Sequence, residues 1–199
     1  MSRLLPDDQV CEAYRHTRRS VLDLLDATPE SSADLVVPAC PDWTVQQTFS
    51  HLVGVPEDLL AGRREGITSD AWTNAQVQRH AGESLAELRS ALEATIASFD
   101  AILPGIPHPS NSQLVMDALA HELDLREALG LECDESSLAL SVAKAWLLGL
   151  IQQSRTPRHP DRGRLGRHPA QAAGLGSSPK FPCRNSARTS ILTSHHFGD

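Results

Sequence analysis

Apolar side chains recur at intervals of three and four residues in five stretches of the chain, the spacing of one face of an α-helix. These stretches cover residues 7–26, 44–65, 84–103, 114–130 and 137–154. No stretch alternates apolar and polar residues with a period of two for long enough to indicate a sheet. The pattern therefore predicts an all-α fold, an antiparallel helical bundle with a long irregular connection between the second and third helices.

Turn-forming residues separate these stretches. Pro38 and Pro41 predict an extended segment, and Thr44 followed by Gln47 three residues later predicts a capping box that begins the second helix. The segment PGIPHPSNS precedes the fourth helix, and its serines and Asn111 are predicted to cap it. The fifth stretch is the most apolar, so we expect it to pack deep in the bundle.

Charge is distributed unevenly along the 199 residues, which carry a formal net charge of −7. The segment from Arg155 onward has eight Lys and Arg against two Asp, whereas the preceding residues have ten against 23 acids. We therefore expect two parts: a helical body over 1–154, and a basic low-complexity tail over 155–199 that is disordered. The composition of the tail also fits an out-of-frame reading of GC-rich coding sequence, so a frameshift is an alternative.

The composition excludes several classes of function. The acidic body would repel nucleic acid, and no apolar run approaches the roughly 20 residues that span a bilayer. Without a secretory leader, the expected location is the cytoplasm. The four cysteines show no CxxC spacing, so a cysteine-rich zinc site is not indicated.

The fourth helix carries polar residues where apolar ones are expected. His121 falls on its apolar stripe, with Asp117 and Asp124 along the edge. A buried carboxylate requires a hydrogen-bond donor, a cation or a metal ion. Asp117 and His121 are four residues apart, which places both side chains on one side of the helix and lets them bind one ion. The alternatives are that His121 is a core histidine bonded to one of the two aspartates, or that the stripe faces solvent.

A third ligand must come from another helix, and His51 is the best candidate because it lies in the middle of the second helix. The other histidines of the body lie among arginines, in an irregular polar stretch or between prolines: His16, His80 and His108. Two histidines and one aspartate supply two neutral nitrogen donors and one anionic oxygen, and leave coordination positions for water or substrate.

Two motifs carry a family resemblance: CPDWTVQQTFSHLVG, and much later DALAHELDLREALG. Together they resemble the DinB-like superfamily, specifically the N-terminal domain of the mycothiol-dependent maleylpyruvate isomerase type. The resemblance implies a four-helix bundle with an additional helix, and a divalent metal, usually zinc, held by His51, Asp117 and His121. The family commonly has Glu where this chain has Asp117, a carboxylate one methylene shorter.

The resemblance also implies an activity: a mycothiol-dependent isomerase or transferase that acts on a small electrophile. A metal ion stabilises a thiolate at neutral pH, and the thiolate is the nucleophile. Asp124 is the candidate catalytic residue, either orienting a ligand histidine or accepting a proton. A salt bridge is its alternative role. Arg126 is the candidate for binding a carboxylate of the co-substrate, with a solvated arginine as the alternative.

Two other functions remain open. The chain could be a non-catalytic helical bundle that acts through a protein partner, with the stripe from Leu140 to Leu150 as the interface. Two histidines and one carboxylate also describe the facial triad of non-haem Fe(II) enzymes, but that triad normally lies on a β-barrel. The sequence does not predict an oligomeric state.

Overall fold

The chain is mostly helical in the computed structural model, which describes residues 4–134 and 136–155. Most of the predicted tail, residues 156–199, lies outside the described residues. The helices and strands follow in the order α1 (Asp7–Ala27), η1 (Glu30–Ser32), β1 (Val36–Val37), β2 (Cys40–Thr44), α2 (Val45–Leu60), α3 (Asp70–Arg79), α4 (Leu85–Ile102), η2 (Leu103–Gly105), α5 (Ser110–Leu129) and α6 (Leu138–Arg155).

The core lies between the long helices. Helix α1 packs against α4 and α5, and α2 packs against the same two helices from the other side. The interior between them is filled by fully buried residues from all four helices, among them Val10, Phe49, Leu88, Phe99 and Leu125. Among the described residues, every helix is too short or too polar to serve as a membrane span.

The capping box predicted at the start of α2 is confirmed. The Thr44 hydroxyl accepts from the backbone N–H of Gln47, and the Gln47 side chain accepts from the backbone N–H of Thr44. These reciprocal bonds satisfy two donors that the first turn of a helix otherwise leaves unpaired. The capping box therefore fixes the residue at which α2 begins, and with it the direction in which each later residue of the helix points.

The structure corrects the sequence prediction in the connections. The extended segment containing both prolines forms a small antiparallel sheet, with Val36 opposite Thr44 and Val37 opposite Cys40. The connection predicted to be irregular contains α3, which begins at a Ser69 cap. Helix α5 begins without a side-chain cap, so the prediction that the serines and Asn111 cap it was wrong.

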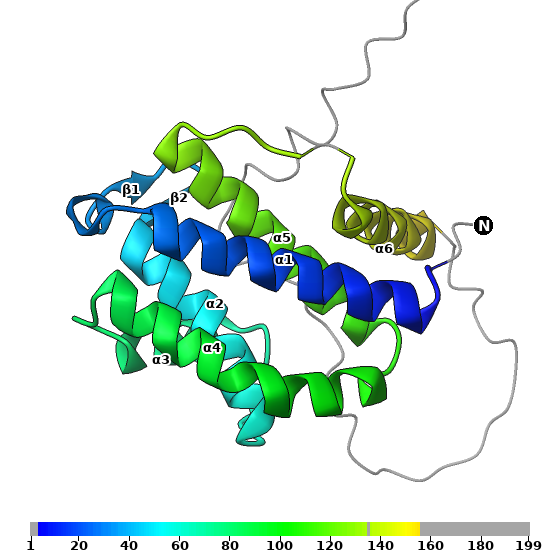
Figure 1. Ribbon diagram of the computed structural model, residues 1–199. Coiled ribbons are helices and arrows are strands. Elements are labelled where there is room, and N and C mark those ends of the chain that lie inside the picture. The colour runs from blue at the N-terminus through cyan, green and yellow to red at the C-terminus, as the bar shows by residue number, and fades with distance from the viewer. Residues whose placement is uncertain (1–3, 135, 156–199) are drawn as a thin grey trace, which may run out of the picture.

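Helix α6 was expected deep in the bundle, and it lies instead on the outside. It packs against α1 and α5 (Figure 1) through Ala139, Val142, Ala143 and Trp146. Its other face leaves Leu148 and Ile151 about half exposed, at 51% and 45%. The high hydropathy of α6 predicted a fully buried helix, but other helices cover only one of its faces.

Close packing of α3 on α2 requires glycine at position 54. A Cβ at Gly54 would lie 2.5 Å from Cβ of Gln76 and 3.3 Å from its Cα. We expect Gly54→Ala to lower the free energy of unfolding by about 1–3 kcal/mol, because overpacking displaces α3. Gly149→Ala is the control, since among the described residues the added methyl group meets no atom within 4 Å beyond its own stretch of helix. That substitution should raise stability by about 0.5–1 kcal/mol, because alanine favours the helix. Urea unfolding measures both, and a Gly54→Ala protein as stable as the wild type would contradict the packing.

Candidate metal centre

Two helices bring three donor side chains together inside the bundle. His51 lies in the middle of α2 and is 2% exposed, and Asp117 and His121 lie one turn apart on α5. Their donor atoms all lie within 4.8 Å of one another. The structure thus brings together the three residues that the sequence analysis named as ligands.

The donor atoms face one another across a short gap. Nε2 of His51 lies 3.3 Å from Oδ2 of Asp117, and Nε2 of His121 lies 3.9 Å from Oδ1 of the same carboxylate. The two imidazole rings meet edge to face, with centroids 4.9 Å apart. Both histidines are buried, whereas the Asp117 side chain is 24% exposed. Two imidazole nitrogens and one carboxylate oxygen are a donor set that fits a divalent cation such as zinc.

The electrostatics of the group favour a cation. Burial disfavours the charged form of Asp117, but the neighbouring His51 and His121 outweigh this effect and hold the pKa of the carboxyl below its usual value. Burial likewise disfavours protonation of His121, but the Asp124 carboxylate 3.3 Å from Nδ1 and the charge of Asp117 raise the pKa of His121. Two carboxylates next to two buried imidazoles therefore attract positive charge, either protons or a metal ion.

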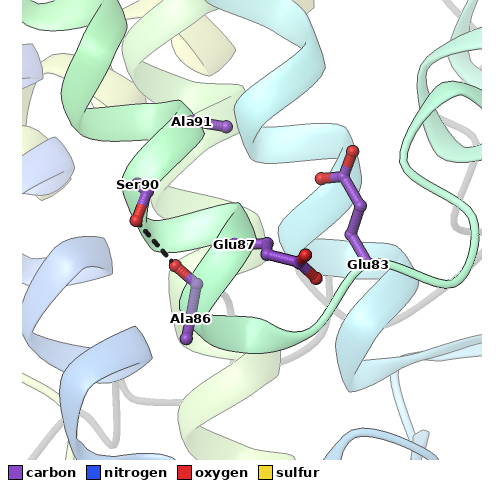
Figure 2. A pocket seen from close by; sticks show the side chains of 5 residues that line it. All are labelled: Glu83, Ala86, Glu87, Ser90 and Ala91. Atoms are coloured by element: carbon purple, nitrogen blue, oxygen red, sulfur yellow. Dashed lines mark hydrogen bonds between the residues drawn. The ribbon is translucent and has the colours of Figure 1, made fainter.

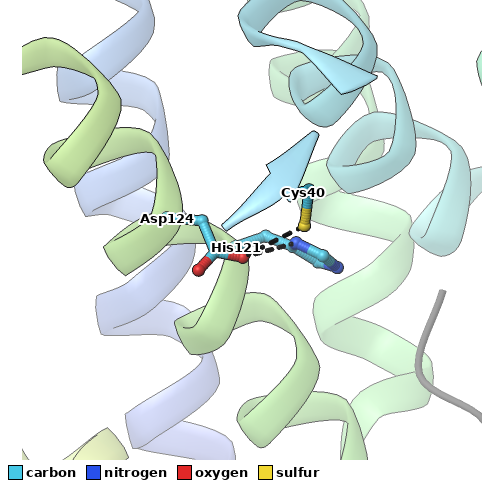
Figure 3. A group of neighbouring side chains, drawn as sticks. All are labelled: Cys40, His121 and Asp124. Carbon is cyan, nitrogen blue, oxygen red and sulfur yellow. Dashed lines mark hydrogen bonds and ion pairs between the residues drawn. The ribbon is translucent and has the colours of Figure 1, made fainter. Parts of the chain in front are cut away.

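Asp124 lies on the far side of His121 from Asp117. Its Oδ2 lies 3.3 Å from Nδ1 of His121, and the Sγ atom of Cys40, on β2, lies 3.6 Å from the same oxygen. Figure 3 shows these three side chains, which form a second cluster of ligand-type residues among the described residues. Cys40 is disulfide-bonded, so its sulfur does not supply a thiolate to this cluster. His121 belongs to both groups, with Nε2 facing His51 and Asp117 and Nδ1 facing Asp124.

Trp43 covers both histidines from β2. Its ring centroid lies 5.3 Å from that of His51 and 5.6 Å from that of His121, and its side chain is buried. The two-stranded sheet therefore supplies an apolar wall that limits access of water to the two imidazoles.

Arg126 is not brought into either group. Its guanidinium donates to Oε1 of Glu122 at 2.9 Å, to the Ser20 hydroxyl at 2.8 Å and to the backbone carbonyl of Glu132 at 3.1 Å. Nine residues separate it from Asp117, so the two side chains point to opposite sides of α5 at about 100° per residue. These contacts join the end of α5 to α1.

Two further histidines have partners elsewhere. His80 contacts Glu83 and Glu57 through its two ring nitrogens, at 2.9 and 3.0 Å, and His108 lies 2.8 Å from a carboxylate oxygen of Asp7. Neither residue joins the metal-ligand groups found among the described residues.

A surface hollow near the start of α4 lies apart from this centre. It is lined by Glu83, Ala86, Glu87, Ser90 and Ala91 (Figure 2). Its polar groups are already bonded locally: Glu87 accepts from the N–H and hydroxyl of Ser84, and Ser90 donates to the carbonyl of Ala86. The hollow shares no residue with the three donors, and we assign it no function.

Two residues behind His51 were not predicted from the sequence. Gln76 of α3 and Asp58 of α2 are both buried, and Gln76 contacts Nδ1 of His51 at 2.7 Å. Asp58 lies seven residues after His51, two turns along the same face of α2, which was a signal available in the sequence. Gln76 lies in the connection expected to be irregular, so no helical periodicity indicated that it points inward.

The fold and the converging donors define a helical protein with a candidate centre for one divalent cation. The chain belongs to the mycothiol maleylpyruvate isomerase N-terminal domain family, whose model matches residues 14–126. The matched region includes all three donors, Trp43 and Gln76, and ends before α6. No curated protein and no solved structure matches the chain.

Proposed function

We propose that this chain binds one divalent metal ion, most favourably zinc, through His51, Asp117 and His121, and uses it in a reaction that depends on a low-molecular-weight thiol. The observation that carries the proposal is the convergence of three donor atoms from two helices within 4.8 Å. The description of the family names mycothiol and the isomerisation of maleylpyruvate. Transfer of the thiol to another small electrophile is the second reaction that we propose. A cytoplasmic location and the absence of nucleic-acid partners are part of this proposal.

When bound, a divalent ion supplies the positive charge that stabilises a thiolate at neutral pH. Asp117 provides the anionic ligand, and its partly exposed side chain supports approach of the thiol and the electrophile from that side of the centre. Trp43 excludes water from the opposite, buried side of the imidazoles. Three protein ligands leave coordination positions for substrate, which is the arrangement of catalytic rather than structural zinc sites.

In an isomerisation of the maleylpyruvate type, the thiolate adds to one carbon of a conjugated double bond. The carbon–sulfur bond forms as the π bond breaks, the remaining single bond rotates, and the same carbon–sulfur bond breaks to restore the double bond. Electrons and protons balance without an oxidant. In this scheme the Asp124 carboxylate, 3.3 Å from Nδ1 of His121, attracts that side of the ring and so keeps Nε2 directed at the centre.

The arrangement of α1, α2, α4 and α5 supports a further part of the proposal, that this is the DinB-like four-helix bundle with α6 as the additional helix. In this arrangement His51 on α2 and the two ligands on α5 face each other across the interior, and α2 and α5 are in contact. Helical bundles typically form metal sites from side chains on facing helices.

The test is turnover by the zinc-loaded chain with maleylpyruvate and mycothiol, followed by the absorbance change of the conjugated double bond. We expect isomerisation that requires both zinc and thiol and stops when a chelator is added. Zinc binding without thiol-dependent turnover would contradict the catalytic part and favour the alternative of a bundle that acts through a protein partner.

Trp43 should report on the metal. A paramagnetic ion such as Co²⁺ held between His51 and His121 would quench the indole that covers both rings. We therefore expect Co²⁺ to lower the tryptophan fluorescence of the metal-free protein, and Trp43→Phe to abolish most of this decrease. Trp72→Phe is the control, because Trp72 lies on α3 with its indole N–H bonded to the carbonyl of Arg63. Equal quenching in the two variants would contradict a metal next to Trp43.

A further inference from the structure

A chain of buried hydrogen bonds lies behind His51, on the side away from Asp117. Nδ1 of His51 lies 2.7 Å from Oε1 of Gln76, and Nε2 of Gln76 lies 2.8 Å from Oδ2 of Asp58. Gln76 is fully buried and Asp58 is 1% exposed. These bonds connect α3 and α2 directly to the nitrogen of His51 that does not face the other two ligands.

The chemistry of these groups fixes the direction of every hydrogen bond. A carboxylate can only accept, so the amide nitrogen of Gln76 must face Asp58 and its oxygen must face His51. The amide oxygen also only accepts, so Nδ1 of His51 must carry a hydrogen. With Nδ1 protonated, Nε2 donates to Oδ2 of Asp117 at 3.3 Å when the ring carries both hydrogens, and it holds a lone pair available to an ion when the ring is neutral.

Two arginines bond to Asp58, which lies at the far end of this series of hydrogen bonds. Oδ1 of Asp58 accepts from Nε of Arg63 at 2.5 Å and from Nη2 of Arg79 at 2.7 Å. The arginines leave Oδ2 to Gln76, and they compensate the charge of a carboxylate that is otherwise buried. Asp58 is thereby held in one orientation, which in turn orients the amide of Gln76.

The backbone is adapted to this contact. Gly54 lies one turn after His51 on α2, and an added Cβ there would collide with Cβ and Cγ of Gln76, at 2.5 and 2.7 Å. Only a glycine at this position lets α3 approach α2 closely enough for the amide of Gln76 to reach the ring of His51.

We propose that Gln76, held by Asp58, is a positioning residue that fixes His51 as the Nδ1–H tautomer and directs its Nε2 lone pair toward Asp117 and His121. The inference rests on the proposed metal function, because a ligand histidine must present a lone pair to the ion. Mutation of the group that accepts a hydrogen bond from a ligand histidine typically lowers metal affinity 10- to 100-fold.

The test uses Gln76→Met, which keeps the length of the side chain and removes the amide. The matched control is Gln46→Met on α2, where the amide bonds to the backbone carbonyls of His80 and Glu83 and does not touch His51. For each protein, nitrogen-15 NMR of labelled histidines in the metal-free state at pH 9 gives the tautomer of His51, and competition with a chromophoric chelator gives the zinc dissociation constant. His51→Ala identifies the His51 signals.

We expect the wild type and Gln46→Met to show a protonated Nδ1 at His51 and equal zinc affinity. Gln76→Met should lose the single tautomer and bind zinc about 10- to 100-fold more weakly. If Gln76→Met does not fold, Gln76→Asn, which keeps the amide one methylene short of His51, should give the same two changes. An unchanged tautomer, or a zinc dissociation constant within about twofold of the wild type, would overturn the role of Gln76.

The two proposals fail differently. A wild-type chain that takes up no zinc, but whose His51 tautomer still depends on Gln76, would overturn the metal function and support the positioning. A chain that binds zinc with the same affinity in the wild type and in Gln76→Met would support the metal function and overturn the positioning.

Discussion

Replacing Asp117 with Asn is expected to empty the metal site while the helices remain intact. Asn keeps the shape of the side chain and can still form hydrogen bonds, but it removes the anionic donor that contacts both His51 and His121. After dialysis against buffered zinc, metal content should fall from about one ion per chain to nearly none. Elemental analysis gives the metal content, and circular dichroism of the same samples shows whether the helices persist.

Variants of the neighbouring residues separate ligands from supporting groups. His51→Ala and His121→Ala should lose metal as Asp117→Asn does, although they lie on different helices. Asp124→Asn should retain the ion with about 10- to 100-fold lower affinity, because Asp124 contacts the nitrogen of His121 that faces away from the centre. If Asp124→Asn empties the site and Asp117→Asn does not, the two carboxylates must exchange roles.

Removing Phe99 should cause the largest loss of stability. Phe99 of α4 is fully buried, and its ring lies 5.2 Å from that of Tyr14 on α1. Phe99→Ala should lower the free energy of unfolding by about 3–5 kcal/mol, because it removes a large apolar side chain and leaves a cavity between two helices. The midpoint of urea unfolding, followed by circular dichroism, measures the loss.

Ile102→Ala provides the comparison on the same helix. Ile102 lies one turn after Phe99 and is 36% exposed, so the loss of its side chain should cost distinctly less than that of Phe99. Equal losses in the two variants would contradict the placement of Phe99 in the core.

The sequence predicted the helices well where apolar periodicity and cap chemistry agreed. Helix α2 begins at the Thr44 and Gln47 box as expected, and α5 ends at Gly130, which adopts a left-handed conformation with φ of 68°. The predictions were wrong where tertiary contacts, rather than local sequence, determine whether a helix forms or how deeply it is buried. Helix α3 has little apolar periodicity and is held to α2 by the buried polar side chain of Gln76, and the depth of α6 depends on which helices cover it.

The candidate centre was more predictable than its surroundings. Asp117 and His121 are close in sequence, so helix geometry alone places them together, and His51 followed from its position on a helix with a core face. Gln76 and Trp43 could not be identified in this way. Each reaches the centre from an element that sequence periodicity did not predict, namely α3 and β2.

Zinc titration of the metal-free wild-type chain, beside a His51→Ala/His121→Ala double variant, tests the central claim most directly. Isothermal titration calorimetry gives the stoichiometry and affinity for both proteins. If His51, Asp117 and His121 form the centre, the wild type binds about one zinc ion per chain and the folded double variant binds none at this affinity. No zinc uptake by the wild type, or equal uptake by the two proteins, would contradict the claim.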